Sequence, residues 1–198
     1  MVIGCRATVL ATALMLAGAA RAGAQENAVH LFTHAGGYSA LENLDDIGAE
    51  LKTGLTLGGG VGYEIDRHVE LRVALTGAQS QLVENGAATG AYLNRYFLVG
   101  DLKVQYPVEH GVTPYGLVGA GVVLLHEKGS TDANKNQGFV HLGGGLAYSI
   151  GKSGLAVFVQ GDGFSYSLSE MTSPNFGRFS RIQIDLGWSA GASYRLPL

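Results

Sequence analysis

The feature that most constrains the fold is a two-residue alternation of apolar and polar residues near the C-terminal end of the chain. Between Ile182 and Leu196 every second residue is apolar, and the residues between them are polar or small. This period is that of a β-strand with one face toward an apolar medium and the other toward a polar one. Because no long segment has a clear period of 3.6 residues, the chain is predicted to be all-β.

Seven further segments alternate in the same way, which gives eight predicted strands in total. Each segment is bounded by residues that favour turns, chiefly Gly, Asn, Asp and Ser. The seven lie at about 27–38, 55–65, 69–76, 98–106, 113–126, 140–150 and 155–162, and those at 27–38 and 113–126 alternate less cleanly.

The expected connections alternate in length. Tight turns are predicted at Asp66-Arg67, Pro107–Gly111 and Gly151–Gly154, whereas longer polar loops are predicted at about 39–50, 79–91, 127–137 and 169–179. Short turns at one end and longer loops at the other are typical of a transmembrane β-barrel of the bacterial outer membrane. An even number of strands would place both termini on the short-turn, periplasmic side.

The first 24 residues differ in composition from the rest. Arg6 precedes a small and apolar run from Ala7 to Ala20, and Ala22-Gly23-Ala24 forms a cleavage site of the A-x-A kind. We therefore expect residues 1–24 to be a cleaved signal peptide for export. Residues 25–198 would then form the mature barrel domain.

Composition narrows the possible functions further. The only cysteine, Cys5, lies in the expected signal peptide, which excludes disulfides and thiolate chemistry from the mature part. The formal net charge of −3 becomes more negative once Arg6 and Arg21 are removed, so nucleic acid is not an expected partner. After Gln25 no run of 18 apolar residues occurs, and no transmembrane helix is expected.

Two patterns favour lipid as the apolar medium outside the barrel. Tyrosines of the apolar faces gather near short turns or the C-terminus, as in an aromatic girdle at a bilayer interface. Charged residues in mid-strand lie on the polar faces, where we expect a charge network inside the lumen. The predicted girdle consists of Tyr63, Tyr106, Tyr115, Tyr148 and Tyr194, and the predicted lumen charge network consists of Glu70, Arg72, Asp101, Lys103, Asp162 and Asp185.

These patterns together predict an eight-stranded antiparallel up-and-down transmembrane β-barrel, because only a closed barrel pairs all backbone groups of such strands in lipid. A barrel of eight strands is just wide enough for its own side chains to fill. The lumen charges are therefore expected to pair with one another, first of all Arg72 with Asp101. Inward glycines are expected to leave room for them, namely Gly58, Gly60, Gly62, Gly143 and Gly145.

Three segments carry a family resemblance: Gly58-Gly59-Gly60-Val61-Gly62-Tyr63, Thr113-Pro114-Tyr115-Gly116-Leu117-Val118-Gly119-Ala120-Gly121, and the C-terminal strand. They resemble the outer-membrane β-barrels typified by the transmembrane domain of outer-membrane protein A and the opacity-type surface proteins. The resemblance covers the mature chain and implies contact with outer-membrane lipid and insertion by the barrel-assembly machinery. The chain departs from the family by ending in Leu196-Pro197-Leu198 without a terminal aromatic residue, and we expect no cell-wall-binding domain after the last strand.

Three functions remain open at this point. The first, which we expect, is a non-catalytic, porin-like surface barrel that supports the envelope or presents short outer loops to a surface partner. The second is a narrow pore gated by the lumen charges around Arg72 and Asp101. The third is a lipid A-modifying barrel enzyme, for which His126, Glu127 and Ser130 would have to act as base, orienting acid and nucleophile.

No catalytic, cofactor-binding or metal-ligating residue is predicted. The six histidines are scattered, and His30 and His34 on one strand lack a carboxylate or cysteine at ligand spacing. The glycine cluster at 58–62 lacks the helix that a nucleotide-binding motif requires. An acidic segment is expected to be a solvated loop, with Glu42, Asp45, Asp46 and Glu50.

Overall fold

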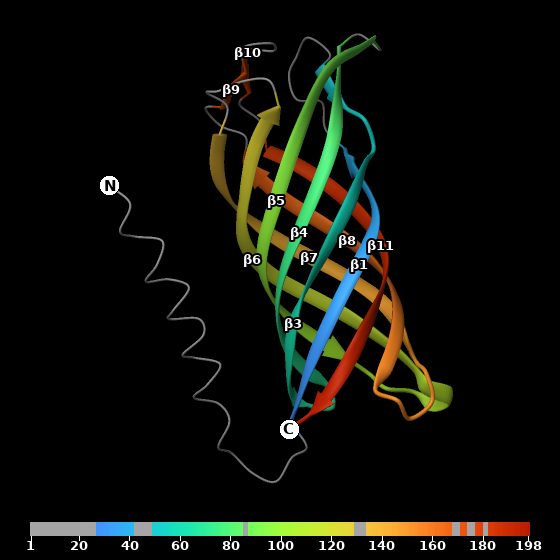
Figure 1. Ribbon diagram of the computed structural model, residues 1–198. Helices are drawn as coiled ribbons and strands as arrows, with labels where there is room; N and C mark the ends of the chain where they lie inside the picture. The colour runs from blue at the N-terminus through green and yellow to red at the C-terminus, as the bar shows by residue number, and fades with distance from the viewer. Residues whose placement is uncertain are drawn as a thin grey trace.

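The computed structural model describes residues 27–41, 49–84, 87–128, 134–167, 171–173, 177–179 and 182–198, which form a tilted β-barrel (Figure 1). Its wall consists of β1 (Ala28–Ala40), β3 (Gly54–Asp66), β4 (Val69–Glu84), β5 (Ala87–Gln105), β6 (Val112–Lys128), β7 (Asn134–Ser149), β8 (Leu155–Ser167) and β11 (Ile182–Pro197). Shorter elements are β2 (Ala49–Leu51), β9 (Met171–Ser173), β10 (Gly177–Phe179) and the 3₁₀ turn η1 (Glu109–Gly111).

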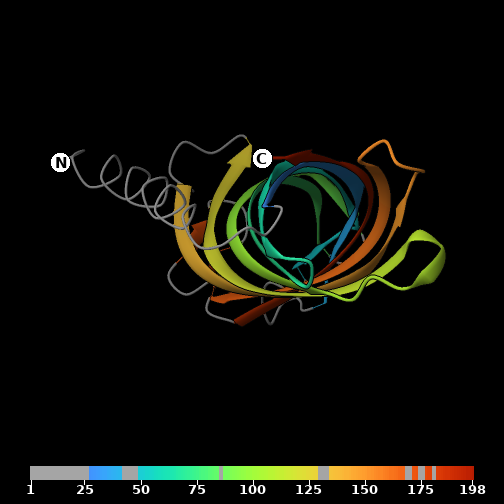
Figure 2. The same ribbon diagram turned by 90° about the horizontal axis from the view of Figure 1, so that it is seen from below.

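Every wall strand pairs antiparallel with its neighbours, and β1 closes the barrel by pairing with β11. Figure 2 shows the resulting ring in a view from below. At the closing seam Ala28 lies opposite Pro197, so the two ends of the barrel domain are adjacent. The all-β, eight-stranded up-and-down barrel predicted from the sequence is confirmed.

The three tight turns lie where the sequence placed them. Asp66 stabilises the first turn, because its Oδ1 accepts hydrogen bonds from the backbone N–H groups of His68 and Val69 at 2.6 and 3.0 Å. The turn between β7 and β8 has glycines at positive φ, 61° at Gly151 and 77° at Gly154, a region that L side chains rarely adopt.

The predicted long loop at 79–91 is wrong. Strand β4 continues to Glu84 and β5 begins at Ala87, with a register irregularity between Gln81 and Val83. The backbone ladder continues where the outward side chains become polar, as at Gln79 and Asn94 opposite each other. The apolar alternation therefore marks only the part of a strand that faces an apolar medium, not the full length of the strand.

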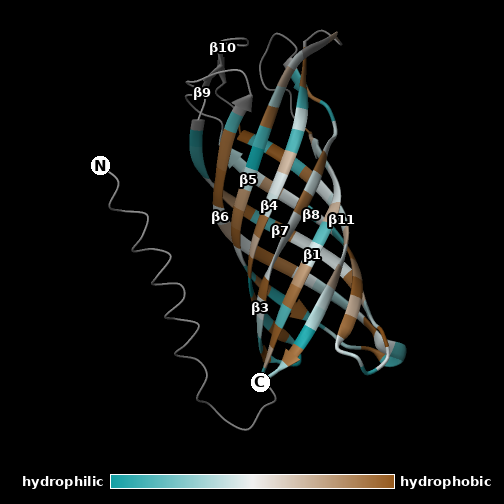
Figure 3. Ribbon diagram, in the orientation of Figure 1, coloured by the Kyte–Doolittle hydropathy of each residue, from teal (hydrophilic) through white to brown (hydrophobic). Residues whose placement is uncertain are grey.

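The outer and inner faces of the wall differ in composition. Outward residues are largely apolar and exposed, which gives the brown bands in Figure 3. The interior holds a buried cluster of aromatic and aliphatic side chains as well as the charged ones. No helix in the described part of the chain has the length and apolar character needed to cross a membrane.

Candidate functional site

The barrel interior is where the ionisable side chains converge, and its lowest layer lies near the tight turns. Glu70 of β4 is almost fully buried, and its Oε2 accepts a hydrogen bond from Lys103 Nζ at 2.8 Å. The same carboxylate lies 3.3 Å from His30 Nδ1, and its Oε1 lies 3.7 Å from Arg72 Nε. Several basic side chains thus surround one carboxylate, which is how a buried carboxylate is tolerated.

His30 links this carboxylate to a second one. Its Nε2 lies 3.0 Å from Glu64 Oε2, and Arg195 Nε donates to the same oxygen at 2.9 Å. The partners come from β1, β3 and β11, which are adjacent strands whose inward positions lie in register. Together with Glu70, Lys103 and Arg72, these side chains form what we call the lower layer.

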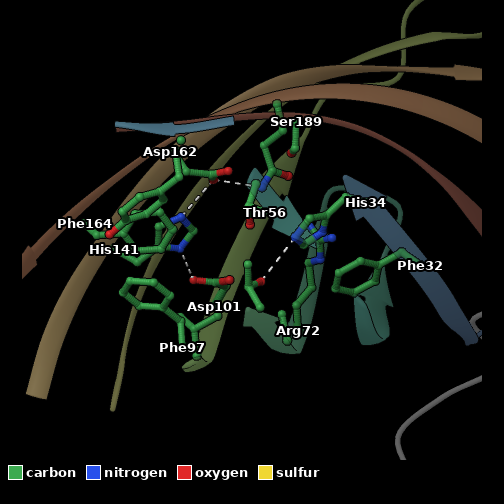
Figure 4. A pocket seen from close by; sticks show the side chains of 16 residues that line it. Phe32, His34, Thr56, Arg72, Phe97, Asp101, His141, Asp162, Phe164 and Ser189 are labelled. Carbon is green, nitrogen blue, oxygen red and sulfur yellow. Dashed lines mark hydrogen bonds and ion pairs between the residues drawn. The ribbon is translucent and has the colours of Figure 1, made fainter. Parts of the chain in front are cut away.

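A small cavity of about 30 Å³ lies above the lower layer (Figure 4). On one side His141 bridges two carboxylates, with Nδ1 2.6 Å from Asp101 Oδ1 and Nε2 2.9 Å from Asp162 Oδ1. On the other side the Arg72 guanidinium stacks over Phe32, 3.8 Å from the ring centroid. The cavity walls therefore carry charges of both signs.

Three buried polar atoms around this cavity have no hydrogen-bond partner in the described part of the chain: Thr56 Oγ1, Arg72 Nε and Ser189 Oγ. A cavity needs roughly 10–15 Å³ for each water molecule. The space is thus large enough for water but too small for an organic substrate, since ligand pockets are commonly about 300–1,000 Å³.

Aromatic rings close the lumen above the cavity. Phe97 lies at their centre, with ring-centroid distances of 4.8 Å to Phe164, 5.3 Å to Phe139 and 5.6 Å to Tyr38. His141 stacks on Phe164 at 4.9 Å, which joins the aromatic layer to the cavity wall. The sequence alternation did not predict this layer, because inward phenylalanines interrupt the polar face.

A second ionic centre lies beyond the aromatic rings, and we call it the upper layer. Arg95 and Asp185 are both fully buried and form an ion pair, with Nη1 3.5 Å from Oδ2. Asp185 also accepts hydrogen bonds from the hydroxyls of Tyr38 and Tyr166 and from the amide of Gln183. Aliphatic side chains of β2, β4, β5 and β6 also belong to the buried core, namely Leu51, Leu82, Leu93 and Leu125.

All six residues proposed as lumen charges lie in the barrel interior, but they pair differently from the expectation. Arg72 and Asp101 are direct register partners on β4 and β5, yet Asp101 bonds to His141 while Arg72 turns toward Glu70 and Phe32. The predicted Arg72–Asp101 pair is therefore wrong, because backbone register does not decide where a long side chain points.

The proposed tyrosine girdle also needs one correction. Tyr106, Tyr148 and Tyr194 are exposed on the outer face, and Tyr63 is half-buried. Tyr115 instead points inward, where its hydroxyl donates to Gln160 Oε1 at 3.0 Å. Strand β6 carries apolar residues on both faces, so its alternation did not reveal which one is internal.

Sequence reasoning missed several members of the interior. Arg95 was missed because it falls between the predicted loop at 79–91 and the predicted strand at 98–106, and Glu64 because it lies next to a predicted turn. His141 was not predicted to be the partner of two carboxylates. Extending the two-residue alternation of inward positions along the full length of β4 and β5 would have identified Arg95 as inward-facing.

The structure gives little support to the alternative catalytic and metal sites. The His126 side chain is exposed on β6, whereas Ser130 lies outside the described residues. Of the acidic segment, Glu42, Asp45 and Asp46 also lie outside the described residues, as does the predicted signal peptide. Within the described ranges, no group of three or more His, Cys, Asp or Glu residues is arranged to hold a metal ion.

Comparison with known proteins gives a consistent family and fold. The sequence matches the family model of the outer membrane protein beta-barrel domain over residues 9–197. Neisserial surface protein A superposes with a TM-score of 0.61 at 12% identity, over 87% of this chain and 99% of that chain. OprG from Pseudomonas aeruginosa gives a TM-score of 0.60 at 11% identity, over 88% and 97%.

The Ail attachment invasion locus protein of Yersinia pestis, in complex with the heparin analogue sucrose octasulfate, gives a TM-score of 0.51 at 13% identity, over 87% of this chain and 100% of that chain. No curated protein sequence matches this chain. Identities this low carry the fold alone, so the structural neighbours do not assign an activity.

Proposed function

The chain belongs to the outer membrane protein β-barrel family, and we propose that it is a non-catalytic barrel that supports the envelope and presents short outer loops. Membership places it in the bacterial outer membrane, in contact with lipid. The proposal includes export by the signal peptide at 1–24, insertion by the barrel-assembly machinery and periplasmic termini. It also includes an interfacial girdle of Tyr63, Tyr106, Tyr148 and Tyr194.

The observation that carries this proposal is a lumen filled by side chains at successive levels. The lower layer, the aromatic rings around Phe97 and the upper layer follow one another along the barrel axis, and the cavity between them is about 30 Å³. A filled eight-stranded barrel is a rigid wall element rather than a channel. Its interior charges have partners, which favours a structural role for them over a catalytic one.

A deletion strain tests the envelope role directly. We expect cells without the protein to take up more of an apolar fluorescent dye and to be more sensitive to detergent with chelator. The wild-type gene should restore both properties. A variant in which residues 42–48 and 129–133 are replaced by Gly-Ser segments should restore them too, while losing any surface binding. Deletion cells that take up no more dye and are no more sensitive to detergent than the parent cells would contradict the envelope role.

A change in the structure of lipid A caused by the protein would overturn the non-catalytic part of the proposal. Mass spectra of lipid A from cells with and without the protein are expected to match. A mass difference of an acyl chain that disappears in a His126→Ala variant would instead assign a lipid A-modifying activity.

A further inference from the structure

The outer surface of the barrel has a hollowed region on strands β11, β1, β3, β4 and β5. Two neighbouring hollows, of about 300 and 660 Å³, share Leu55, Gln79 and Trp188 in their walls. Register places Trp188, Gly37, Leu55, Gln79 and Asn94 in one row across the five strands. The hollows are therefore one continuous feature of the wall, which we call the outer groove.

Small residues form the floor of the outer groove, and two large apolar side chains stand between its two hollows. Gly37, Ala35 and Gly77 face outward at its base. Leu55 and Trp188 rise beside them, with exposed fractions of 80% and 63%. The indole of Trp188 lies over Gly37, because a Cβ there would be only 2.4 Å from an indole carbon. The groove thus depends on glycines that thin the wall.

One rim of the outer groove is polar but uncharged. Gln79 Nε2 donates a hydrogen bond to Asn94 Oδ1 at 2.8 Å, and Thr53, Gln81 and Tyr92 lie on the same rim. Among the described residues that line the two hollows, none is an Asp, Glu, Lys, Arg or His. The rim is formed by the parts of β4 and β5 that lie far from the tight turns, where the outward side chains change from apolar to polar.

We propose that the outer groove binds one acyl chain of an outer-membrane lipid, with the lipid head group at the amide rim. This goes beyond the closed-barrel function and does not depend on it. The groove is continuous with the apolar surface that meets the bilayer, so lipid is already the neighbouring medium. Its size falls in the range of ligand pockets, about 300–1,000 Å³. Amide and hydroxyl groups at the depth where the apolar surface ends match a molecule that is apolar along its chain and polar at its head.

The shape of the surface favours a flexible chain over a second barrel. Leu55 stands in the middle of the groove, with one hollow on each side. A rigid strand wall of another copy would meet this ridge and leave both hollows unfilled, and unfilled space forfeits dispersion contacts. An acyl chain can bend around the ridge and fill the space beside it.

Trp188 is the only tryptophan of the chain, so its fluorescence reports on the groove. The protein is purified from membranes and reconstituted into phosphatidylethanolamine–phosphatidylglycerol vesicles that contain a small fraction of lipid with brominated chains. A retained lipid raises Trp188 quenching above the value expected from random mixing. We expect at least a twofold excess for the wild type at low fractions of brominated lipid.

Gly77→Leu is the variant designed to fill the groove. A Cβ at Gly77 meets ring carbons of Tyr96 at 3.7 Å and the Leu57 carbonyl oxygen at 3.8 Å, which are ordinary contacts, so the backbone has no need to move. The matched control is Gly138→Leu on β7, which is outside the groove and whose added Cβ has its nearest neighbour at 4.0 Å. Folding of both is checked by the change of gel mobility on heating.

The proposal predicts that Gly77→Leu brings quenching down to the random-mixing value and that Gly138→Leu keeps the excess. Random-mixing quenching in the wild type would overturn it, as would an excess that Gly77→Leu leaves unchanged. Quenching that falls as protein density rises would assign the groove to a second copy and also overturn it. Should Gly77→Leu fail to fold, mass spectrometry of the wild-type protein released from detergent tests the proposal instead. One retained lipid per barrel is the expected result, and a barrel without a retained lipid would contradict the proposal.

Discussion

The two ionic layers of the lumen differ in how their buried charges are compensated. In the lower layer Glu70 has Lys103, His30 and Arg72 around it, and the Arg195 side chain beside Glu64 is 35% exposed. Among the described residues of the upper layer, a single cation, Arg95, faces a single carboxylate, Asp185, and both are 0% exposed.

This difference indicates which of the two layers is more sensitive to the loss of a charged residue. A buried charge that loses its only partner cannot be rescued by solvent, whereas a charge within a group of several partners keeps some compensation. Neutral donors from Tyr38, Tyr166 and Gln183 complete the environment of Asp185 but supply no countercharge for Arg95. The upper layer should therefore contribute more stability per residue than the lower layer, although it contains fewer charges.

The largest effect is expected from Asp185→Asn, which keeps the shape but leaves Arg95 uncompensated. Breaking a buried pair from one side costs about 3–5 kcal/mol. Urea unfolding in vesicles, followed by Trp188 fluorescence, measures the loss. The double variant Arg95→Met with Asp185→Asn should recover a large part of it, and a double variant as unstable as the single one would show that the pair is not the cause.

A smaller effect is expected from Glu70→Gln in the lower layer. The variant removes the carboxylate shared by Lys103 and Arg72, but Glu64 remains nearby through His30. We expect a loss of about 1–3 kcal/mol, the range for a buried polar group that loses its partner. The same unfolding experiment measures it, and a loss as large as that of Asp185→Asn would remove the distinction between the layers.

The smallest effect is expected from Glu64→Gln. Glu64 is itself buried and also contacts His30, but its partner Arg195 is 35% exposed and can be solvated, so we expect a loss of about 1 kcal/mol. Raising the salt concentration should weaken the wild-type contribution further, so wild type and variant should converge in stability at high salt. A difference in stability that does not depend on salt would indicate that water reaches this end of the lumen less than the exposure of Arg195 implies.

The sequence predicted the wall of this barrel better than its filling. Two-residue alternation located the eight strands, because a strand between lipid and lumen must segregate its side chains. Tyr115 was misplaced because β6 is apolar on both faces, with Leu117 inside and Val118 outside. Arg95 was missed because its strand extends beyond the apolar pattern.

Pairing inside the lumen required the structure itself. Arg72 has Asp101 directly across the strand pair, yet its rotamer takes it to Phe32 and Glu70. Asp101 instead meets His141, which is 40 residues away in sequence. Such partners depend on how all eight strands curve around one axis, and a strand-by-strand pattern does not contain that information.

The most direct test of a closed lumen is planar-bilayer conductance of the folded wild-type protein, verified by heat-dependent gel mobility. We expect a silent bilayer, because the aromatic rings and both ionic layers fill the cross-section. Discrete, reproducible steps from the wild type would contradict the closed lumen and establish a narrow pore.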